Sequence, residues 1–237
     1  MRKLNRSDAV NSFIARIDQG DTEFVDTIIN EFDNQEQLKE DSLEMLFRGL
    51  PELENDARMI LVKVTCLNEF YSTRLNSNPA KSSPSRKIAV DIATMAEHIS
   101  MLIENQELAD LIAFGDAKAV DLIRWIPNKA AGIYSDAYSF ATKYCSWHNP
   151  EAYPIVDGYS KAMVYYLFCS LFGTMLEGVR ITYSALQDYE TFCRLFNELK
   201  TWINNRCAPS KEYSVKDCDK LFWYYASYRA VNSGLYI

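Results

Sequence analysis

The sequence predicts an all-α fold, and three observations carry this prediction. The 237 residues include only 8 glycines, which is few for a chain built from strands and tight turns. Apolar residues recur every three or four positions over long stretches, as on the buried face of a helix. No stretch alternates apolar and polar residues over the length of a strand between two hairpin turns. Because 48% of the residues are hydrophobic, we expect one helical domain over residues 1–237 with a substantial core.

Helix-start and helix-stop residues divide the beginning of the chain into three short predicted helices. Ser7 is a good N-cap for the first helix, and Gly20 ends it. Asp21 starts the second helix. The third covers about 36–49 and ends before Pro51, which cannot continue a helix.

A longer helix at about 54–75 leads into the clearest loop of the sequence. This loop, 76–85, is rich in serine, asparagine and proline. If the domain has two lobes, we expect their boundary here. Pro84 or Ser85 begins the next helix, and Asp116 caps another one further along the chain.

Three caps organise the C-terminal part of the chain. Asp157 is an N-cap for a helix that continues to about residue 171. Ser184 and Gln187 have the spacing of a capping box, which predicts a helix from there to about residue 205. Ser214 caps the final predicted helix.

Charge and composition narrow the classes of function. The net charge of −7 and the pI of about 5.0 weigh against a non-specific nucleic-acid binder, which needs a basic surface. A local basic cleft remains compatible with this total, because net charge averages over all faces. The six cysteines are widely spaced and only two histidines are present, so we expect reduced thiols, no metal site and no cofactor.

The sequence also predicts a cytoplasmic protein. The first six residues include three basic ones and lack the apolar core of a signal peptide. The most apolar stretch, 162–176, is too short to span a bilayer. We therefore expect no membrane partner.

Residues 139–157 form the most informative segment of the sequence. They hold one of the two histidines, one of the four tryptophans and two of the seven prolines. Lys143 lies among aromatic residues, on a helix whose cap is Ser139 or Ser135. An amine must be uncharged to act as a nucleophile, and burial near a helix N-terminus favours the uncharged form. The alternative is an ordinary lysine on the surface of a helix.

A second candidate catalytic residue, Asp157, comes at the end of this segment. An aspartate before a helix is an N-cap by default, and its carboxylate can also stabilise a developing positive charge. The two roles are compatible, because one oxygen can accept backbone N–H groups while the other faces a ligand. Position in the sequence does not distinguish them.

Five further residues are candidates for substrate binding. The rings of Tyr144 and Trp147 could stack on a planar base or pack in the core, and His148 could act as a base or fix the turn that follows it. Asn68 and Arg74 belong to a polar cluster near the end of the 54–75 helix. This cluster lines a cleft or simply marks a helix end that approaches solvent.

Three short motifs within 140–157 resemble the catalytic segment of the helix-hairpin-helix DNA glycosylase superfamily. They are Phe-Ala-Thr-Lys-Tyr, His-Asn-Pro-Glu and Tyr-Pro-Ile-Val-Asp. The segment is most similar to the 8-oxoguanine glycosylase-like branch, in a divergent bacterial group. The resemblance implies that Lys143 attacks the sugar C1′ atom of a modified nucleotide in double-stranded DNA. Asp157 then assists proton transfer, the base is flipped into a pocket beside Tyr144 or Trp147, and Asn68 enters the gap in the duplex.

One departure from the pattern of this family concerns its hairpin. The family has a Leu-Pro-Gly-x-Gly hairpin, whereas 129–135 of this chain hold a single glycine. Two other classes of function therefore stay open. One is a non-catalytic helical binding or scaffold protein, and the other is a module that binds a free nucleobase or nucleotide.

Overall fold

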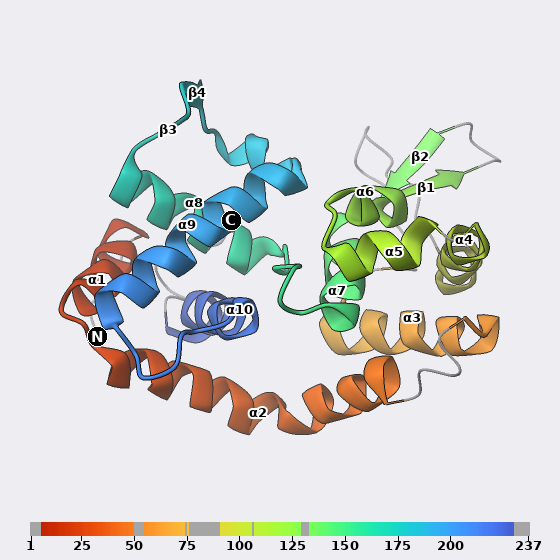
Figure 1. The fold of residues 1–237 in the computed structure, drawn as a ribbon, viewed down its shortest axis with the longest axis horizontal. Helices are drawn as coiled ribbons and strands as arrows, with labels where there is room; N and C mark the ends of the chain where they lie inside the picture. The colour runs from red at the N-terminus through yellow and green to blue at the C-terminus, as the bar shows by residue number, and fades with distance from the viewer. Residues whose placement is uncertain are drawn as a thin grey trace, which may run out of the picture. The chain divides into compact units, whose positions relative to one another are not determined.

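A computed structural model describes residues 6–49, 55–73, 75, 91–105, 107–128 and 133–229. The all-α prediction is confirmed, because the described residues are mostly helical and contain only two short antiparallel strand pairs (Figure 1). The chain divides into two compact units. We call Met1–Gln37 with Pro154–Ile237 the terminal unit, and Leu38–Tyr153 the central unit.

The two changes of unit lie between residues 37 and 38 and between residues 153 and 154. The first of these lies inside helix α2 (Thr22–Arg48). The loop 76–85, where the sequence places a lobe boundary, lies outside the described residues.

The terminal unit is a helical bundle with an aromatic core. Helix α8 packs against α1, α9 and α10, and the rings of Phe13, Phe196, Phe222 and Tyr225 meet between the helices. In addition to the first part of α2, the described elements of this unit are α1 (Arg6–Asp18), α8 (Gly158–Phe172), β3 (Met175–Leu176), β4 (Val179–Arg180), the 3-10 turn η2 (Tyr183–Gln187), α9 (Tyr189–Cys207), α10 (Val215–Tyr224) and η3 (Tyr225–Arg229).

In the part of the central unit that the structure describes, the end of α2 and helices α3 to α7 accompany one β-hairpin. Helix α3 packs against α4 and α7, and α6 packs against α7. In addition to the last part of α2, the described elements of this unit are α3 (Ala57–Tyr71), α4 (Ile92–Glu104), α5 (Glu107–Phe114), α6 (Lys118–Arg124), β1 (Trp125–Asn128), β2 (Ile133–Asp136) and α7 (Tyr138–His148).

Two predicted helix starts are confirmed by their capping geometry. Asp157 and Ser214 each accept a hydrogen bond from the backbone N–H three residues later, and the side chain of that residue bonds back to the cap, which completes a capping box at α8 and α10. Helix α1 ends near Gly20, whose φ of +69° suits glycine best.

Other boundaries differ from the prediction. Thr22–Arg48 form one helix instead of the two predicted, because no glycine or proline separates the two apolar stretches. The prediction of a capping box at Ser184 is wrong. Ser184 lies within η2, and Asp188 caps α9 by accepting the N–H of Thr191.

The start of α7 and the hairpin before it were also not predicted. Strands β1 and β2 pair antiparallel with Trp125 opposite Asp136 and Pro127 opposite Tyr134. Neither Ser135 nor Ser139 caps α7, because Ala137 occupies the cap position and the Asp136 carboxylate accepts the N–H of Tyr138 at 3.1 Å. Strands of four residues are too short to give a periodic signal in the sequence.

Candidate functional site

Lys143 lies in the second turn of α7 and is almost completely buried, with 3% of its surface exposed. Its Nζ donates a hydrogen bond of 2.6 Å to Oγ of Ser139, one turn earlier on the same helix. The amine also lies 5.4 Å from the ring centroid of Tyr71 on α3, which is within cation–π range. The alternative of an ordinary surface lysine is therefore wrong.

The aromatic residues that follow Lys143 gather around Phe47 at the end of α2. The ring centroid of Phe47 lies 5.7 Å from that of Tyr144, 6.2 Å from Trp147 and 5.0 Å from His148. The Tyr144 hydroxyl, the Trp147 indole nitrogen and Nε2 of His148 are all shielded from solvent. The structure thus brings three of the predicted binding residues together, and their rings pack against Phe47 in the interior of the central unit.

A second lysine, Lys63 on α3, is buried in the same unit with 1% of its surface exposed. Its Nζ lies 5.0 Å from the ring centroid of Phe47. On the same helix, the Tyr71 hydroxyl donates to Oε1 of Glu40 at 3.0 Å. Helices α2, α3 and α7 therefore place two buried amines against aromatic rings. The i, i+4 spacing of Ser139 and Lys143 was readable in the sequence, but the contribution of Lys63 was not.

The Asn-Pro loop after α7 is explained by its contacts with α5. Nδ2 of Asn149 donates to the carbonyl oxygens of Ile112 at 2.9 Å and Ala113 at 3.1 Å, which satisfies the end of α5. Gly115 follows that helix with a φ of +72°, and a Cβ there would lie 2.7 Å from Cβ of Ala152. Asn149 and Ala152 of the 139–157 segment thus have structural contacts in the central unit.

Asp157 is half-buried at the start of α8 in the terminal unit. Its Oδ1 accepts the N–H groups of Tyr159 at 2.8 Å and Ser160 at 2.9 Å. Oδ2 accepts no hydrogen bond from the residues that the structure describes. The predicted cap is therefore confirmed, and a role for Oδ2 towards a ligand stays a prediction.

The segment before Asp157 is fixed by three other elements of the terminal unit. The N–H of Ile155 lies 3.1 and 2.9 Å from the two carboxylate oxygens of Asp219 on α10. Tyr189 on α9 donates its hydroxyl hydrogen to the carbonyl oxygen of Pro154 at 3.0 Å, and Ser160 donates to the carbonyl oxygen of Ile155 at 2.8 Å. Asp219 comes about 60 residues after this segment, so no local pattern indicates the contact.

The two remaining predicted residues have different outcomes. Asn68 is buried at the end of α3, where its Oδ1 accepts the hydroxyl of Thr73 at 3.0 Å and the N–H of Leu75 at 2.9 Å. These bonds make Asn68 a helix-end residue. Arg74 lies outside the described residues.

Cysteines, acidic side chains and histidines were the other groups considered for chemistry in the sequence, and the structure describes their surroundings. All six cysteines are free, and complete burial raises the pKa of the Cys145 thiol well above its usual range, which keeps it protonated and unreactive. Among the described residues, no three histidine, cysteine, aspartate or glutamate side chains gather closely enough to hold a metal ion. Within the same residues, none of the helices combines the length and apolar character that crossing a membrane requires.

Comparison with known proteins gives a family for the chain. The model of the family HI_0787_N, described as an N-terminal domain, matches residues 23–152. Because this match covers more than half of the chain, the chain belongs to that family. Lys143 lies inside the matched region and Asp157 lies after it.

A protein of Haemophilus influenzae with the description "Uncharacterized protein" is 37% identical over 71 residues. The match takes in 28% of this chain and 35% of that protein, so the chain spans about a third of the relative's length. No solved structure matches the chain.

Proposed function

We propose that this chain is a DNA glycosylase-like enzyme that excises a modified base, with Lys143 as the nucleophile and Asp157 as the assisting carboxylate. The main support is the buried amine of Lys143, held 2.6 Å from the hydroxyl of Ser139. Enzymes that use a lysine as a nucleophile keep it in a desolvated setting of this kind. The assignment of Asp157 comes from the resemblance and is supported by its uncommitted Oδ2.

The proposed chemistry is a displacement at C1′ of the modified nucleotide. The lone pair of Lys143 Nζ forms a bond to C1′, and the bond from C1′ to the base breaks, so that its electron pair leaves with the base. The base gains a proton and the attacking amine loses one, for which the adjacent Ser139 hydroxyl is placed as a relay. A carboxylate in the role given to Asp157 stabilises the positive charge that develops on the sugar.

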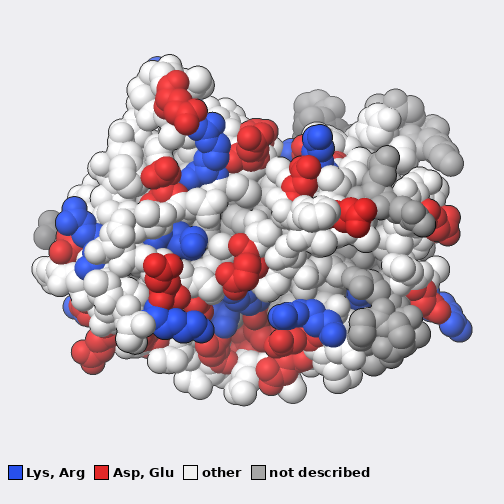
Figure 2. All heavy atoms as spheres, in the orientation of Figure 1, with Lys and Arg blue, Asp and Glu red and all other residues white. Residues whose placement is uncertain are grey.

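The proposal requires DNA as the partner, and the charge of the surface limits how it binds. Among the described residues on the face shown in Figure 2, lysine and arginine side chains are interspersed with aspartate and glutamate side chains. We therefore expect weak binding to undamaged duplex, with affinity that depends on recognising the modified base.

Borohydride trapping tests the proposal directly. The protein is incubated with a panel of duplexes, each with one modified base, and the imine that a lysine forms with the opened sugar is reduced to a stable adduct. We expect an adduct with the wild-type protein and none with Lys143→Gln. The matched control is Lys63→Gln, which removes the other buried lysine of the central unit and should still form the adduct. No adduct with any duplex, or an equal adduct with Lys143→Gln, would overturn the proposed role of Lys143.

A further inference from the structure

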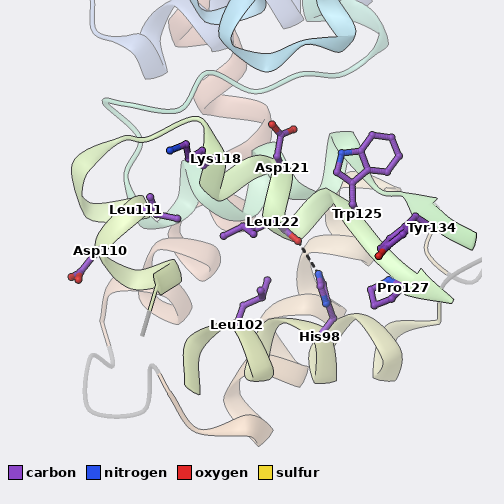
Figure 3. Close-up of a pocket in the computed structure, with 10 residues that line it drawn as sticks. All are labelled: His98, Leu102, Asp110, Leu111, Lys118, Asp121, Leu122, Trp125, Pro127 and Tyr134. Atoms are coloured by element: carbon purple, nitrogen blue, oxygen red, sulfur yellow. Dashed lines mark hydrogen bonds between the residues drawn. The ribbon is translucent and has the colours of Figure 1, made fainter. Parts of the chain in front are cut away.

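A pocket of about 810 Å³ opens in the central unit, apart from the residues of the proposed reaction. Its volume lies within the range of roughly 300–1,000 Å³ that small-molecule sites occupy. Figure 3 shows Trp125, Pro127 and Tyr134 of the hairpin at one end, and Asp110, Leu111 and Lys118 at the other. His98 and Leu102 of α4 and Leu122 of α6 lie between the two ends.

The hairpin end of this pocket presents aromatic rings to solvent. Trp125 is 43% exposed and Tyr134 is 67% exposed, although large apolar rings are normally covered. The register of β1 and β2 puts Trp125, Pro127 and Tyr134 on the same face of the hairpin. Single exposed rings are common, but two on one face beside a pocket form a surface on which a planar ring can stack.

The exposed indole of Trp125 lies against a partly buried ion pair. The guanidinium of Arg124 lies 4.6 Å from the Trp125 ring centroid and 4.1 Å from that of Tyr138. Its Nε and a terminal nitrogen bond the two carboxylate oxygens of Asp136 at 2.8 and 3.0 Å. Arg124 therefore covers one part of the indole with a rigid polar layer, while the exposed part stays open to a ligand.

His98 supplies a polar group in the middle of the pocket. It is 8% exposed, and its Nε2 donates to the carbonyl oxygen of Leu122 at 2.8 Å, because a carbonyl can only accept. Burial lowers the pKa of this imidazole and keeps it neutral near pH 7. In that neutral ring Nδ1 carries a lone pair, and it forms no hydrogen bond with the described residues. It is thus an acceptor for an N–H donor on a ligand.

The charges at the rim favour a ligand without a phosphate. Asp110 and Asp121 contribute two negative charges to the lining and Lys118 contributes one positive charge. The whole protein carries a net charge of −7. A neutral or cationic ligand therefore fits this pocket better than a nucleotide phosphate or a nucleic-acid strand.

We infer that this pocket binds a free planar nitrogen heterocycle of the purine nucleoside class. The ring stacks at the Trp125 end of the pocket, and an N–H group of the ligand donates to Nδ1 of His98. This binding is independent of Lys143 and does not require the proposed glycosylase reaction.

Titration calorimetry with adenosine on the full chain tests this inference. We expect binding in the range of about 0.1–1 mM, which is typical of one stacked ring with one or two hydrogen bonds. Trp125→Ala should weaken it by about tenfold or more, and Trp125→Phe, which keeps a ring, by less than about threefold. The control variant Lys143→Gln should bind adenosine as the wild type does. Circular dichroism confirms that each variant is folded.

Two further ligands test the effect of a phosphate group and the hydrogen bond to His98. Adenosine monophosphate should bind more weakly than adenosine because of the two rim carboxylates. N6,N6-dimethyladenosine, which lacks the N–H donor, should lose affinity for the wild type but not for His98→Leu, whose side chain has no acceptor. No detectable binding of adenosine at about 5 mM would overturn the inference. Tighter binding of a single-stranded adenine oligonucleotide than of adenosine would overturn the choice of a free ligand.

Discussion

Lys143 and Asp157 are both polar residues of one short sequence segment, yet the structure holds them in opposite ways. Lys143 is surrounded by side chains, with a hydroxyl and an aromatic ring as its named contacts. Asp157 is fixed through the backbone, because its Oδ1 accepts two N–H groups of α8 and the preceding residues are bonded to α9 and α10. The environment of Lys143 thus depends on packing, and the environment of Asp157 depends on hydrogen bonds.

This difference shows how each residue should respond to substitution. A packed site tolerates an apolar side chain of similar shape, because only the polar group is lost. A hydrogen-bonded site does not, because a donor is left without its acceptor. Substitutions at Asp219, Lys143 and Asp157 test this contrast, and the largest effect is expected at Asp219.

The largest effect should come from Asp219, the residue that holds the segment before Asp157. Asp219→Ala removes both acceptors of the Ile155 N–H, and we expect the free energy of unfolding to fall by about 3 kcal/mol. Urea unfolding followed by circular dichroism measures the change. The exposed Glu198→Ala on α9 is the control and should change stability by less than about 0.5 kcal/mol. An equally small loss for Asp219→Ala would show that the segment is fixed by other contacts.

Lys143→Met tests the packed site and should act in the other direction. Methionine fills a similar volume without a buried amine, so the protein should gain about 1 kcal/mol of stability while losing the trapped adduct. The exposed Lys118→Met of the same unit serves as the control, with stability unchanged. A marked loss of stability for Lys143→Met would mean that the amine is a structural group.

Asp157→Ala and Asp157→Asn separate capping from chemistry. The alanine variant loses the cap of α8 and should be less stable by about 1 kcal/mol, whereas asparagine still accepts the N–H groups and should cost only a few tenths. Both variants lose the charge, so both should lower the rate of base release by at least about tenfold. A rate that follows stability, with Asp157→Asn as active as the wild type, would make Asp157 a cap alone.

The smallest effect concerns pH and comes from neither of these two residues. Burial lowers the pKa of His98 below its ordinary value of 6.5, so the unfolded chain binds more protons than the folded chain below that pH. The contribution of His98 to stability is therefore fully present above about pH 6.5 and is lost as the pH falls towards the pKa of the folded state. Urea unfolding at about pH 7.5, 6.5 and 5.5 should show a smaller decrease for His98→Gln than for the wild type. Equal decreases would place the titrating group elsewhere.

The sequence alone determined the helical class and the helix starts that rest on local chemistry. Asp157 and Ser214 could be read as caps because a cap and the N–H groups it bonds lie within three residues of each other. The break expected near residue 36 was wrong, because a polar interval without glycine or proline does not end a helix. The Ser184 cap was wrong because a serine followed three residues later by glutamine also suits a 3-10 turn before the true cap, Asp188.

Only the tertiary structure decided the environments of the candidate residues. The sequence could place Lys143 on a helix among aromatic residues, but its burial depends on Tyr71 of α3, which comes more than 70 residues earlier. In the same way, the Ile155 N–H bonds to Asp219, which lies 64 residues later in the chain. The exposure of the Trp125 side chain depends on the pairing of β1 with β2, which sets the face on which it lies. Caps and periodicity are local in the chain and can be read from it, whereas burial and polar pairing depend on segments that meet only after folding.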